Sequence, residues 1–276
     1  MSDNRQMPHK PSHTPPHPPR APEKAKLADG SEIKKVIGVG SGKGGVGKSF
    51  VTANLAVALA KKGLKVGIMD ADITGPSIPQ AFGLKGMLRS VDGTLIEPET
   101  TDLGIKIVSV NLLMADPNQP VVWRGPVLSG IIGQFWSEVN WGTLDVLLID
   151  MPPGTADVPL TVFQTIPVDG FILVATGQDL AAMIVNKARN MASMMNVPIL
   201  GMVENMSYVK CPHCDEVISL FGDGSAVLKS AEEIGVPVLA SIPLDPAVTR
   251  KVDSGKAEEC EIAALADAVD TVAALL

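Results

Sequence analysis

The chain has 276 residues, 46% of them hydrophobic, and a formal net charge of −7 at pH 7. This size and apolar content suffice for one large α/β domain, and the acidic balance argues against general nucleic-acid affinity, so no nucleic-acid partner is expected. No apolar run is long enough to span a membrane, and the N-terminus lacks the apolar core of a signal peptide. We therefore expect a cytoplasmic protein without a membrane partner.

A tail rich in proline and histidine occupies residues 1–30, with seven prolines and three histidines but almost no large apolar side chains. Such a segment cannot bury enough surface to offset the entropy lost on folding. The histidines could bind a metal weakly, but a disordered, solvated arm is the simpler interpretation. We therefore predict one folded domain over residues 31–276.

A phosphate-binding loop is predicted next, because one stretch matches the pattern G-x-x-x-x-G-K-[ST], namely Gly42-Lys43-Gly44-Gly45-Val46-Gly47-Lys48-Ser49. An apolar run at 36–39 predicts a buried strand before the loop, and apolar residues at helical spacing between 51 and 59 predict a helix after it, capped by Gly63. The glycines let backbone N–H groups converge on a polyphosphate, Lys48 can reach the terminal phosphates, and Ser49 can ligate Mg²⁺. This context favours nucleotide binding over a glycine-rich turn without a ligand.

A second strand is predicted at residues 64–70, and a crossover of this length implies that it runs parallel to the first. Asp70 and Asp72 then lie at the carboxyl edge of the sheet, where open α/β sheets bind their ligands. A Gly-Pro pair rules out a continuing helix in the loop at 73–77. Residues 87–120 are expected to form a β-rich excursion ending in a strand at 105–110, followed by a helix at about 128–139.

A further buried strand is predicted at residues 145–150, apolar in its interior and ending in Asp150. An acid at the end of a hydrophobic strand beside a phosphate loop can hold Mg²⁺ through a bound water. A stiff turn at 152–155 follows, in which the N–H of Gly154 could approach the γ-phosphate and form part of a switch.

The remainder predicts strands at 171–176, 199–204 and 238–242 and a helix at 179–195. Asn205 follows the second of these strands, and Pro243-Leu244-Asp245 follows the third. Apolar residues between 262 and 276 predict a last helix, and its acidic side chains favour packing on the core over anchoring in a membrane. The expected fold class is α/β, a doubly wound and mostly parallel sheet with helices on both faces.

A pair of cysteines, Cys211 and Cys214 in the string Cys-Pro-His-Cys, is the second chemical feature. A tetrahedral metal site or a cubane cluster needs about four ligands, and the third cysteine, Cys260, is remote in sequence. A two-fold dimer would complete the site with the same pair from each subunit, and His213 is an alternative ligand. A shared structural zinc site, a redox dithiol and an inert turn remain open, although redox dithiols are typical of helix N-termini.

The loop also contains a second lysine, Lys43, and it resembles the deviant Walker A motif of the MinD/ParA/nitrogenase-iron-protein group of dimeric ATPases. Four further strings narrow the resemblance to the Mrp (ApbC-like) family of iron–sulfur cluster carrier ATPases, over about residues 33–276. They are DADITGPS at 70–77, WRGP at 123–126, DMPPGT at 150–155 and VENMSY at 203–208. The last string, followed by the cysteine pair, is the most specific, because MinD and ParA lack this combination.

The resemblance implies a homodimeric and slow ATP hydrolase that binds ATP and Mg²⁺ and passes a [4Fe–4S] cluster to apo iron–sulfur proteins. It implies that Lys48 and Ser49 bind phosphate and Mg²⁺ with Asp150 in the metal shell. It also implies that Lys43 acts on the nucleotide of the other subunit and that Asp72 orients the attacking water.

Two further sets of residues receive roles from the same resemblance. Asn205, Pro243 and Asp245 would face the purine. Cys211 and Cys214 would hold the cluster between two subunits, in an insertion near residues 205–222.

The chain departs from the family at Phe50, where many relatives carry a second hydroxyl, so an α-phosphate contact there falls to the backbone N–H. Ala156 stands where a glycine is common. Two other functions stay open. One is a MinD/ParA-like positioning ATPase with a structural zinc site, against which the acidic last helix argues. The other is a nucleotide-gated electron donor, which in the nitrogenase iron protein uses widely separated single cysteines.

Overall fold

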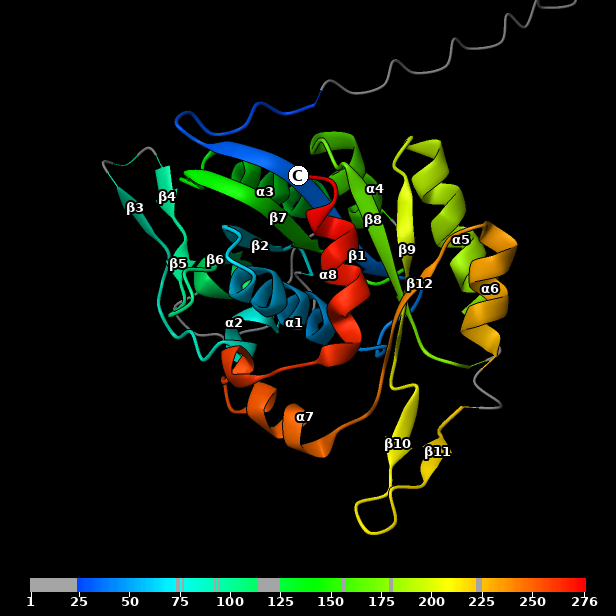
Figure 1. Cartoon of the computed structure of the whole chain (residues 1–276). Coiled ribbons are helices and arrows are strands. Elements are labelled where there is room, and N and C mark those ends of the chain that lie inside the picture. Colours follow the sequence, from blue (N-terminus) through cyan, green and yellow to red (C-terminus); the bar gives the residue numbers. More distant parts are fainter. Residues whose placement is uncertain are drawn as a thin grey trace, which may run out of the picture.

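The structure is a computed structural model that describes residues 24–72, 75, 77–91, 93, 95–113, 125–154, 157–178, 181–221 and 225–276. Within them an eight-stranded sheet forms the centre of the molecule, with helices on both of its faces (Figure 1). The strand order is β12-β9-β8-β1-β7-β2-β6-β5, and neighbouring strands are parallel except β5 and β6. The expected doubly wound and mostly parallel α/β sheet is confirmed.

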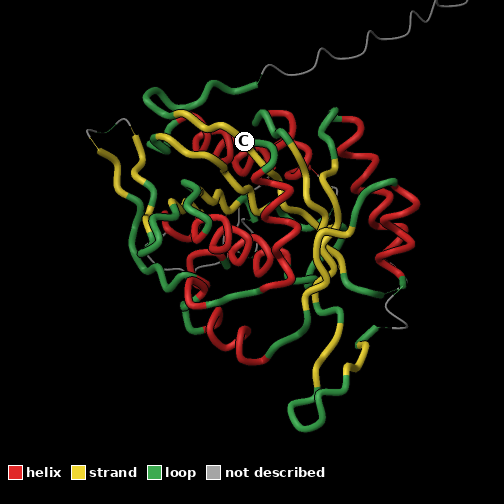
Figure 2. The backbone as a smooth tube through the Cα atoms, viewed as in Figure 1, coloured by secondary structure: helices red, strands yellow, loops and turns green. Residues whose placement is uncertain are grey.

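The elements alternate along the chain as a βαβ fold requires (Figure 2). The sheet contains β1 (Glu32–Ser41), β2 (Val66–Asp70), β5 (Glu99–Thr100), β6 (Lys106–Ser109), β7 (Thr143–Asp150), β8 (Gly170–Ala175), β9 (Ile199–Asn205) and β12 (Val238–Ile242). Two hairpins are formed by β3 (Arg89–Val91) with β4 (Leu95–Glu97) and by β10 (Tyr208–Lys210) with β11 (Val217–Ser219). The α-helices are α1 (Lys48–Lys61), α2 (Ile78–Ala81), α3 (Gly125–Ser137), α4 (Asp157–Thr165), α5 (Ala181–Met194), α6 (Ala226–Ile234), α7 (Pro246–Asp253) and α8 (Ala266–Ala273).

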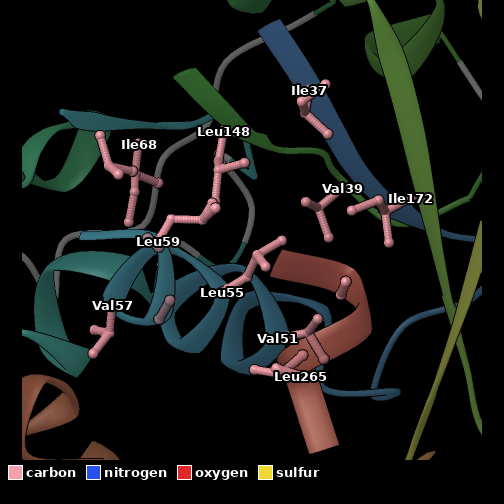
Figure 3. Close-up of a cluster of buried hydrophobic side chains, with 14 of the residues drawn as sticks. Ile37, Val39, Val51, Leu55, Val57, Leu59, Ile68, Leu148, Ile172 and Leu265 are labelled. Atoms are coloured by element: carbon pink, nitrogen blue, oxygen red, sulfur yellow. The ribbon is translucent and has the colours of Figure 1, made fainter. Parts of the chain in front are cut away.

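The central strands bury side chains on both faces, because successive residues of a strand point to opposite sides of the sheet. On one face Ile37, Ile68 and Leu148 belong to the same buried cluster as Leu55 and Leu59 of α1 (Figure 3). On the other face the neighbouring strand residues pack against α3, α4, α5 and α6. Burial of each such side chain stabilises the fold by about 1.5–3 kcal/mol, so this core holds the strand ends in place.

Every predicted strand is present, although several ends differ by one to four residues. The helix predicted from about residue 128 begins at Gly125, since Pro126 is well suited to a first helical turn. Helix α1 ends as predicted, with Gly63 at φ 91° and the N–H of Leu64 donating to the carbonyl of Leu59 at 3.2 Å. Several predicted features lie outside the described residues: 73, 74 and 76 of one loop, Trp123 and Arg124, residues 155–156, and residues 179–180 of the predicted helix at 179–195.

The predicted boundary between tail and domain at residue 31 is too late. The N–H of Ala25 donates to the carbonyl of Thr165 at 2.8 Å, and the indole N–H of Trp136 donates to the carbonyl of Ala25 at 2.9 Å. Ala28 is buried. The segment from residue 24 therefore packs along α3 and α4 as part of the domain.

The C-terminal helix packs on the core, as predicted. Ala268, Val269 and Val272 of α8 are buried in the cluster that includes α1. Across the described residues, no helix is both long enough and apolar enough to cross a membrane.

Candidate functional site

The phosphate loop joins the end of β1 to the start of α1 at the carboxyl edge of the sheet. Gly45 and Gly47 adopt φ values of 80° and 77°, in the left-handed region that favours glycine. Among the described residues, no hydrogen-bond acceptor is found for the backbone N–H groups of residues 44–50. The loop thus presents a row of free donors at a helix N-terminus, which suits a polyphosphate.

Asn205, at the end of β9, lies directly against this loop. Its Nδ2 donates to the carbonyl of Val46 at 2.9 Å, and a Cβ placed on Gly47 would collide with the same Nδ2. Residue 47 must therefore be glycine for two reasons, its backbone conformation and this close approach. This contact places Asn205, which is predicted to face the purine, beside the phosphate loop.

Lys48 is buried beside two of the predicted acids. Its Nζ lies 2.8 Å from Oδ1 of Asp150 and 3.5 Å from Oδ2 of Asp72, and all three residues are buried. The structure thus brings together Lys48 of the phosphate loop and two acids, Asp72 and Asp150, that lie at or just beyond the ends of two different strands. A buried ammonium needs such partners, and a nucleotide phosphate could compete with them for it.

Ser49 and Asp150 form the oxygen set expected for Mg²⁺. The hydroxyl of Ser49 donates to Oδ2 of Asp150 at 2.6 Å, so both oxygens point into one space at the mouth of the loop. A hydroxyl and a carboxylate are hard oxygen ligands of the kind that Mg²⁺ takes together with water and phosphate. The residues present therefore fit the metal.

Thr52, which the sequence analysis missed, fixes the orientation of Asp150. Its hydroxyl donates to Oδ1 of Asp150 at 2.8 Å from a fully buried position on α1. The sequence places Asp70 at the sheet edge without assigning it a role. It accepts a hydrogen bond from the hydroxyl of Ser109 at 3.0 Å, and burial, followed by the nearby Asp150 charge, raises the pKa of Asp70 well above its usual range. The sheet register pairs Asp70 with Asp150 on adjacent strands, a proximity that only the fold reveals.

A cavity of about 460 Å³ opens over the phosphate loop, a size within the range of small-molecule sites. It is lined by residues 44–50 together with Asp72, Asn205, Pro243 and Asp245, whereas Gly42 and Lys43 of the predicted loop do not line it. Part of its wall was not predicted and comes from two short helices: Ser77, Gln80 and Ala81 at α2, and Thr249, Val252 and Asp253 of α7. Ser41, Pro153, Met206 and Leu244 also line the cavity. The phosphate loop, the 243–245 turn and these helices thus line one cavity.

Asp245 has a structural role that the prediction did not include. Its Oδ1 accepts a hydrogen bond from the N–H of Ala247 at 2.7 Å, which makes it the N-cap of α7. The carboxylate is therefore engaged with the helix, and any contact to a base at this residue falls mainly to the backbone.

Two predicted phosphate contacts are engaged within the chain. The ammonium of Lys43 donates to Oε1 of Gln178, after β8, in the same subunit. The N–H of Gly154 donates to the carbonyl of Ser41 at 2.9 Å. Each group would have to leave its present acceptor to reach a phosphate.

The cysteine pair lies at the tip of the β10–β11 hairpin, within the predicted insertion near 205–222. The hairpin extends away from the sheet beyond α7 (Figure 1). Cys214 is exposed and Cys211 is half-buried, and the N–H of Cys211 donates to the carbonyl of Glu216 at 2.9 Å. Hydrogen bonding from the backbone of His213 and Cys214 lowers the pKa of Cys211, which favours the thiolate that binds metal.

Cys260 does not join this pair. It is buried near the end of α7, where burial raises its pKa, and its sulfur lies 3.9 Å from the carbonyl of Lys256. Across the described part of the chain, no group of three or more His, Cys, Asp or Glu side chains could hold a metal ion. Within the described residues the pair therefore stands without a third ligand, and a cluster site shared between two subunits stays a prediction.

Comparison with known proteins gives consistent matches. The family model for the NUBPL iron-transfer P-loop NTPase matches residues 32–275. An iron–sulfur cluster carrier protein of Clostridium perfringens is 47% identical over 234 residues, which are 82% of each chain. One of Methanocaldococcus jannaschii is 48% identical over 237 residues, 85% of this chain and 81% of that protein.

Solved structures agree with these matches. A nucleotide-binding protein of Archaeoglobus fulgidus in complex with ADP superposes with a TM-score of 0.74 at 45% identity, covering 83% of this chain and 89% of that one. The cell-division ATPase MinD of Pyrococcus furiosus superposes with a TM-score of 0.59 at 24% identity, covering 88% of this chain and 100% of that one, which supports the fold alone.

Proposed function

The chain belongs to the family of NUBPL iron-transfer P-loop NTPases, and from this premise we propose that it is a homodimeric ATPase that carries an iron–sulfur cluster and passes it to apo-proteins. The observation that carries the proposal is the Cys211–Cys214 pair, with Cys214 exposed and Cys211 half-buried. It offers half of a cluster's ligands on a hairpin whose base adjoins the nucleotide cavity.

The nucleotide half of the proposal uses residues that already converge. The free N–H groups of the loop and the ammonium of Lys48 would hold the β- and γ-phosphates of ATP. Ser49 and Asp150 would hold Mg²⁺, which bridges phosphate oxygens and neutralises the charge that develops on them. Asp72, which is buried with its Oδ2 3.5 Å from Nζ of Lys48, would orient the attacking water.

Dimerisation is proposed on two grounds. Lys43 would exchange its bond to Gln178 for the nucleotide of a second subunit, which adds positive charge where the phosphate charge develops. The cysteine pair needs two further ligands, and a two-fold axis supplies them as a second copy of the same pair. Such a site suits a [4Fe–4S] cluster, and slow hydrolysis would pace its handover.

The cellular setting follows from the same chemistry. The three cysteines are unpaired, and free thiols of this kind are typical of a reducing compartment, so we place the protein in the cytoplasm. The net charge of −7 supports protein acceptors rather than nucleic acid or anionic membranes as partners.

A transfer experiment tests this function. The protein is reconstituted with iron and sulfide under anaerobic conditions and mixed with an apo iron–sulfur protein in the presence of a soluble iron chelator. Direct transfer predicts that the acceptor gains the cluster's visible absorbance while the chelator stays largely free. Complete capture of the iron by the chelator would contradict a carrier role.

A further inference from the structure

The route from the nucleotide cavity to the cysteine pair is short. Asn205 contacts the phosphate loop through Val46, and Cys211 follows only six positions later in the chain. The intervening residues are the bend at Met206 and Ser207 and the strand β10. A conformational change at the phosphate loop can therefore reach the cysteines along one continuous segment of the chain.

Met206 occupies the bend of this path in an unusual conformation. Its φ of 55° lies in the left-handed region, which a residue with a Cβ seldom adopts, so the surrounding contacts must hold it there. Its side chain also lines the cavity, with its terminal methyl near Gly47. The residue that turns the chain out of the sheet is therefore one that a bound nucleotide would touch.

A second cavity-lining segment holds the chain just beyond the bend. The N–H and the hydroxyl of Ser207 both donate to the carbonyl of Ile242 at 2.9 Å, and the N–H of Leu244 donates to the carbonyl of Tyr208 at 2.8 Å. Leu244 lies in the turn after β12 that forms part of the cavity wall. The chain is thus bonded to residues at the cavity both before Met206, at Asn205, and after it, at Ser207 and Tyr208.

The far end of the hairpin has looser attachments. Residues 212–220, which include β11, are exposed, and Phe221 lies against Gly177 where the chain returns to the body. Figure 1 shows the tip well beyond the sheet, so a small rotation at the base displaces the cysteines. The direction of the tip is set where Met206 bends the chain.

We infer that Met206 is the joint through which occupancy of the phosphate cavity positions Cys211 and Cys214, a role that deepens the proposed function and rests on it. A ligand in the cavity contacts the Met206 side chain and thereby shifts the backbone conformation of the same residue. This conformational change is transmitted through Ser207 and Tyr208 to β10. Met206 is thus a positioning residue that links the nucleotide state to the geometry of the cluster ligands.

The test compares two glycine substitutions at the same backbone angle. Asn196, two residues after α5, also has a φ of 55° but does not line the cavity, so Asn196→Gly introduces glycine at the same backbone angle elsewhere. Hydrogen exchange of the full-length, iron-free chain is followed by mass spectrometry with and without Mg·ADP. In the natural protein and in Asn196→Gly, exchange at residues 208–219 is expected to change by roughly threefold or more on binding ADP.

At ADP concentrations that saturate each variant, as checked by calorimetry, Met206→Gly is expected to lose this change in exchange. Met206→Ala keeps the backbone preference but removes the side chain from the cavity, and it is expected to lose most of the change as well. A full ADP-dependent change in either Met206 variant, or none in the natural protein, would overturn the inference. Because the experiment contains no iron, a failure to bind or transfer a cluster leaves its result unaffected.

Discussion

The hydroxyl of Ser49 lies 2.6 Å from Oδ2 of Asp150, so the start of α1 and the end of β7 meet at one pair of oxygens. Each residue comes from a separate motif, about a hundred positions apart in the chain. The parallel pairing of β1 with β7 brings them together, and Thr52 and Lys48 hold the other oxygen of the carboxylate. The two oxygens proposed to hold Mg²⁺ therefore already lie together at the mouth of the phosphate loop.

Removal of the Thr52 hydroxyl is expected to weaken this cation site. In Thr52→Val the side chain keeps its shape, but Oδ1 of Asp150 loses its 2.8 Å hydrogen bond. Loss of an outer partner of this kind typically costs 10–100-fold in metal affinity, so half-maximal ATPase activity should need about tenfold more Mg²⁺. Thr271→Val on α8 is the matched control, and an unchanged Mg²⁺ requirement in Thr52→Val would show that Thr52 does not orient Asp150.

Replacement of Gly47 is expected to abolish nucleotide binding while the fold persists. Gly47→Ala forces a Cβ into the left-handed region and into Asn205. Gly235→Ala, at the end of α6, is an informative control because Gly235 has a φ of 72° and open space around it. Both variants should lose about 1–2 kcal/mol of stability in urea unfolding, and Gly47→Ala alone should fail to bind ADP in calorimetry. Equal ADP binding by the two variants would refute the role of the Asn205 contact.

Asp70 is expected to destabilise the folded protein as pH rises. Its raised pKa means that the folded state keeps a proton that the unfolded state has released, so stability falls with pH between the unfolded and folded pKa values. Asp70→Asn should therefore be more stable than the natural protein at pH 8, by about 1 kcal/mol, with a smaller gap at pH 5. Urea unfolding at the two pH values measures this difference in the free energy of unfolding between Asp70→Asn and the natural protein.

Asp145 provides a control for this experiment, because its negative charge is expected to stabilise the folded protein rather than destabilise it. The Lys34 side chain and then the backbone of Lys65 lower the pKa of Asp145, so its ionised form stabilises the fold above its unfolded pKa. Asp145→Asn should lose stability at pH 8 relative to the natural protein. A loss of stability at pH 8 in Asp70→Asn as well would contradict the account of Asp70.

The Cys211 thiol is expected to react at lower pH than an ordinary thiol. Hydrogen bonding from the backbone of His213 and Cys214 lowers its pKa, so the reactive thiolate is already populated below the usual midpoint near pH 8.5. Cys260 is an internal control, since burial raises its pKa and limits access. Alkylation of the iron-free protein by iodoacetamide, followed by mass spectrometry across pH, should label Cys211 first. Equal rates at Cys211 and Cys260 would disprove the lowered pKa.

The sequence predicted those parts of the site that short motifs encode. The loop at 42–49 and the acid at 150 are local patterns, and apolar strands flank them, so both could be placed on the sheet edge. Thr52 and Asp70 could not be assigned, because their roles depend on which carboxylate the sheet register brings beside them. The N-cap role of Asp245 did have a signal, since Asp-Pro is typical of a helix start.

The part of the cavity wall that α2 and α7 form could not be predicted, for a different reason. Helix α2 has four residues and α7 has eight, too few for a hydrophobic period to emerge. Their positions depend on backbone packing between Gly83 and Gly255, where a Cβ on Gly255 would collide with Gly83. The ordering of residues 24–30 likewise depends partly on hydrogen bonds to α3 and α4 rather than on apolar content.

The most direct test of the central claim is the iron and sulfide content per dimer after anaerobic reconstitution, with the mass of the assembly measured on the same sample. The natural protein and Cys260→Ala should each bind about four iron per dimer, because Cys260 is buried away from the hairpin. The double variant Cys211→Ala/Cys214→Ala should bind none and keep its ADP affinity. A full complement of iron in the double variant would contradict the account.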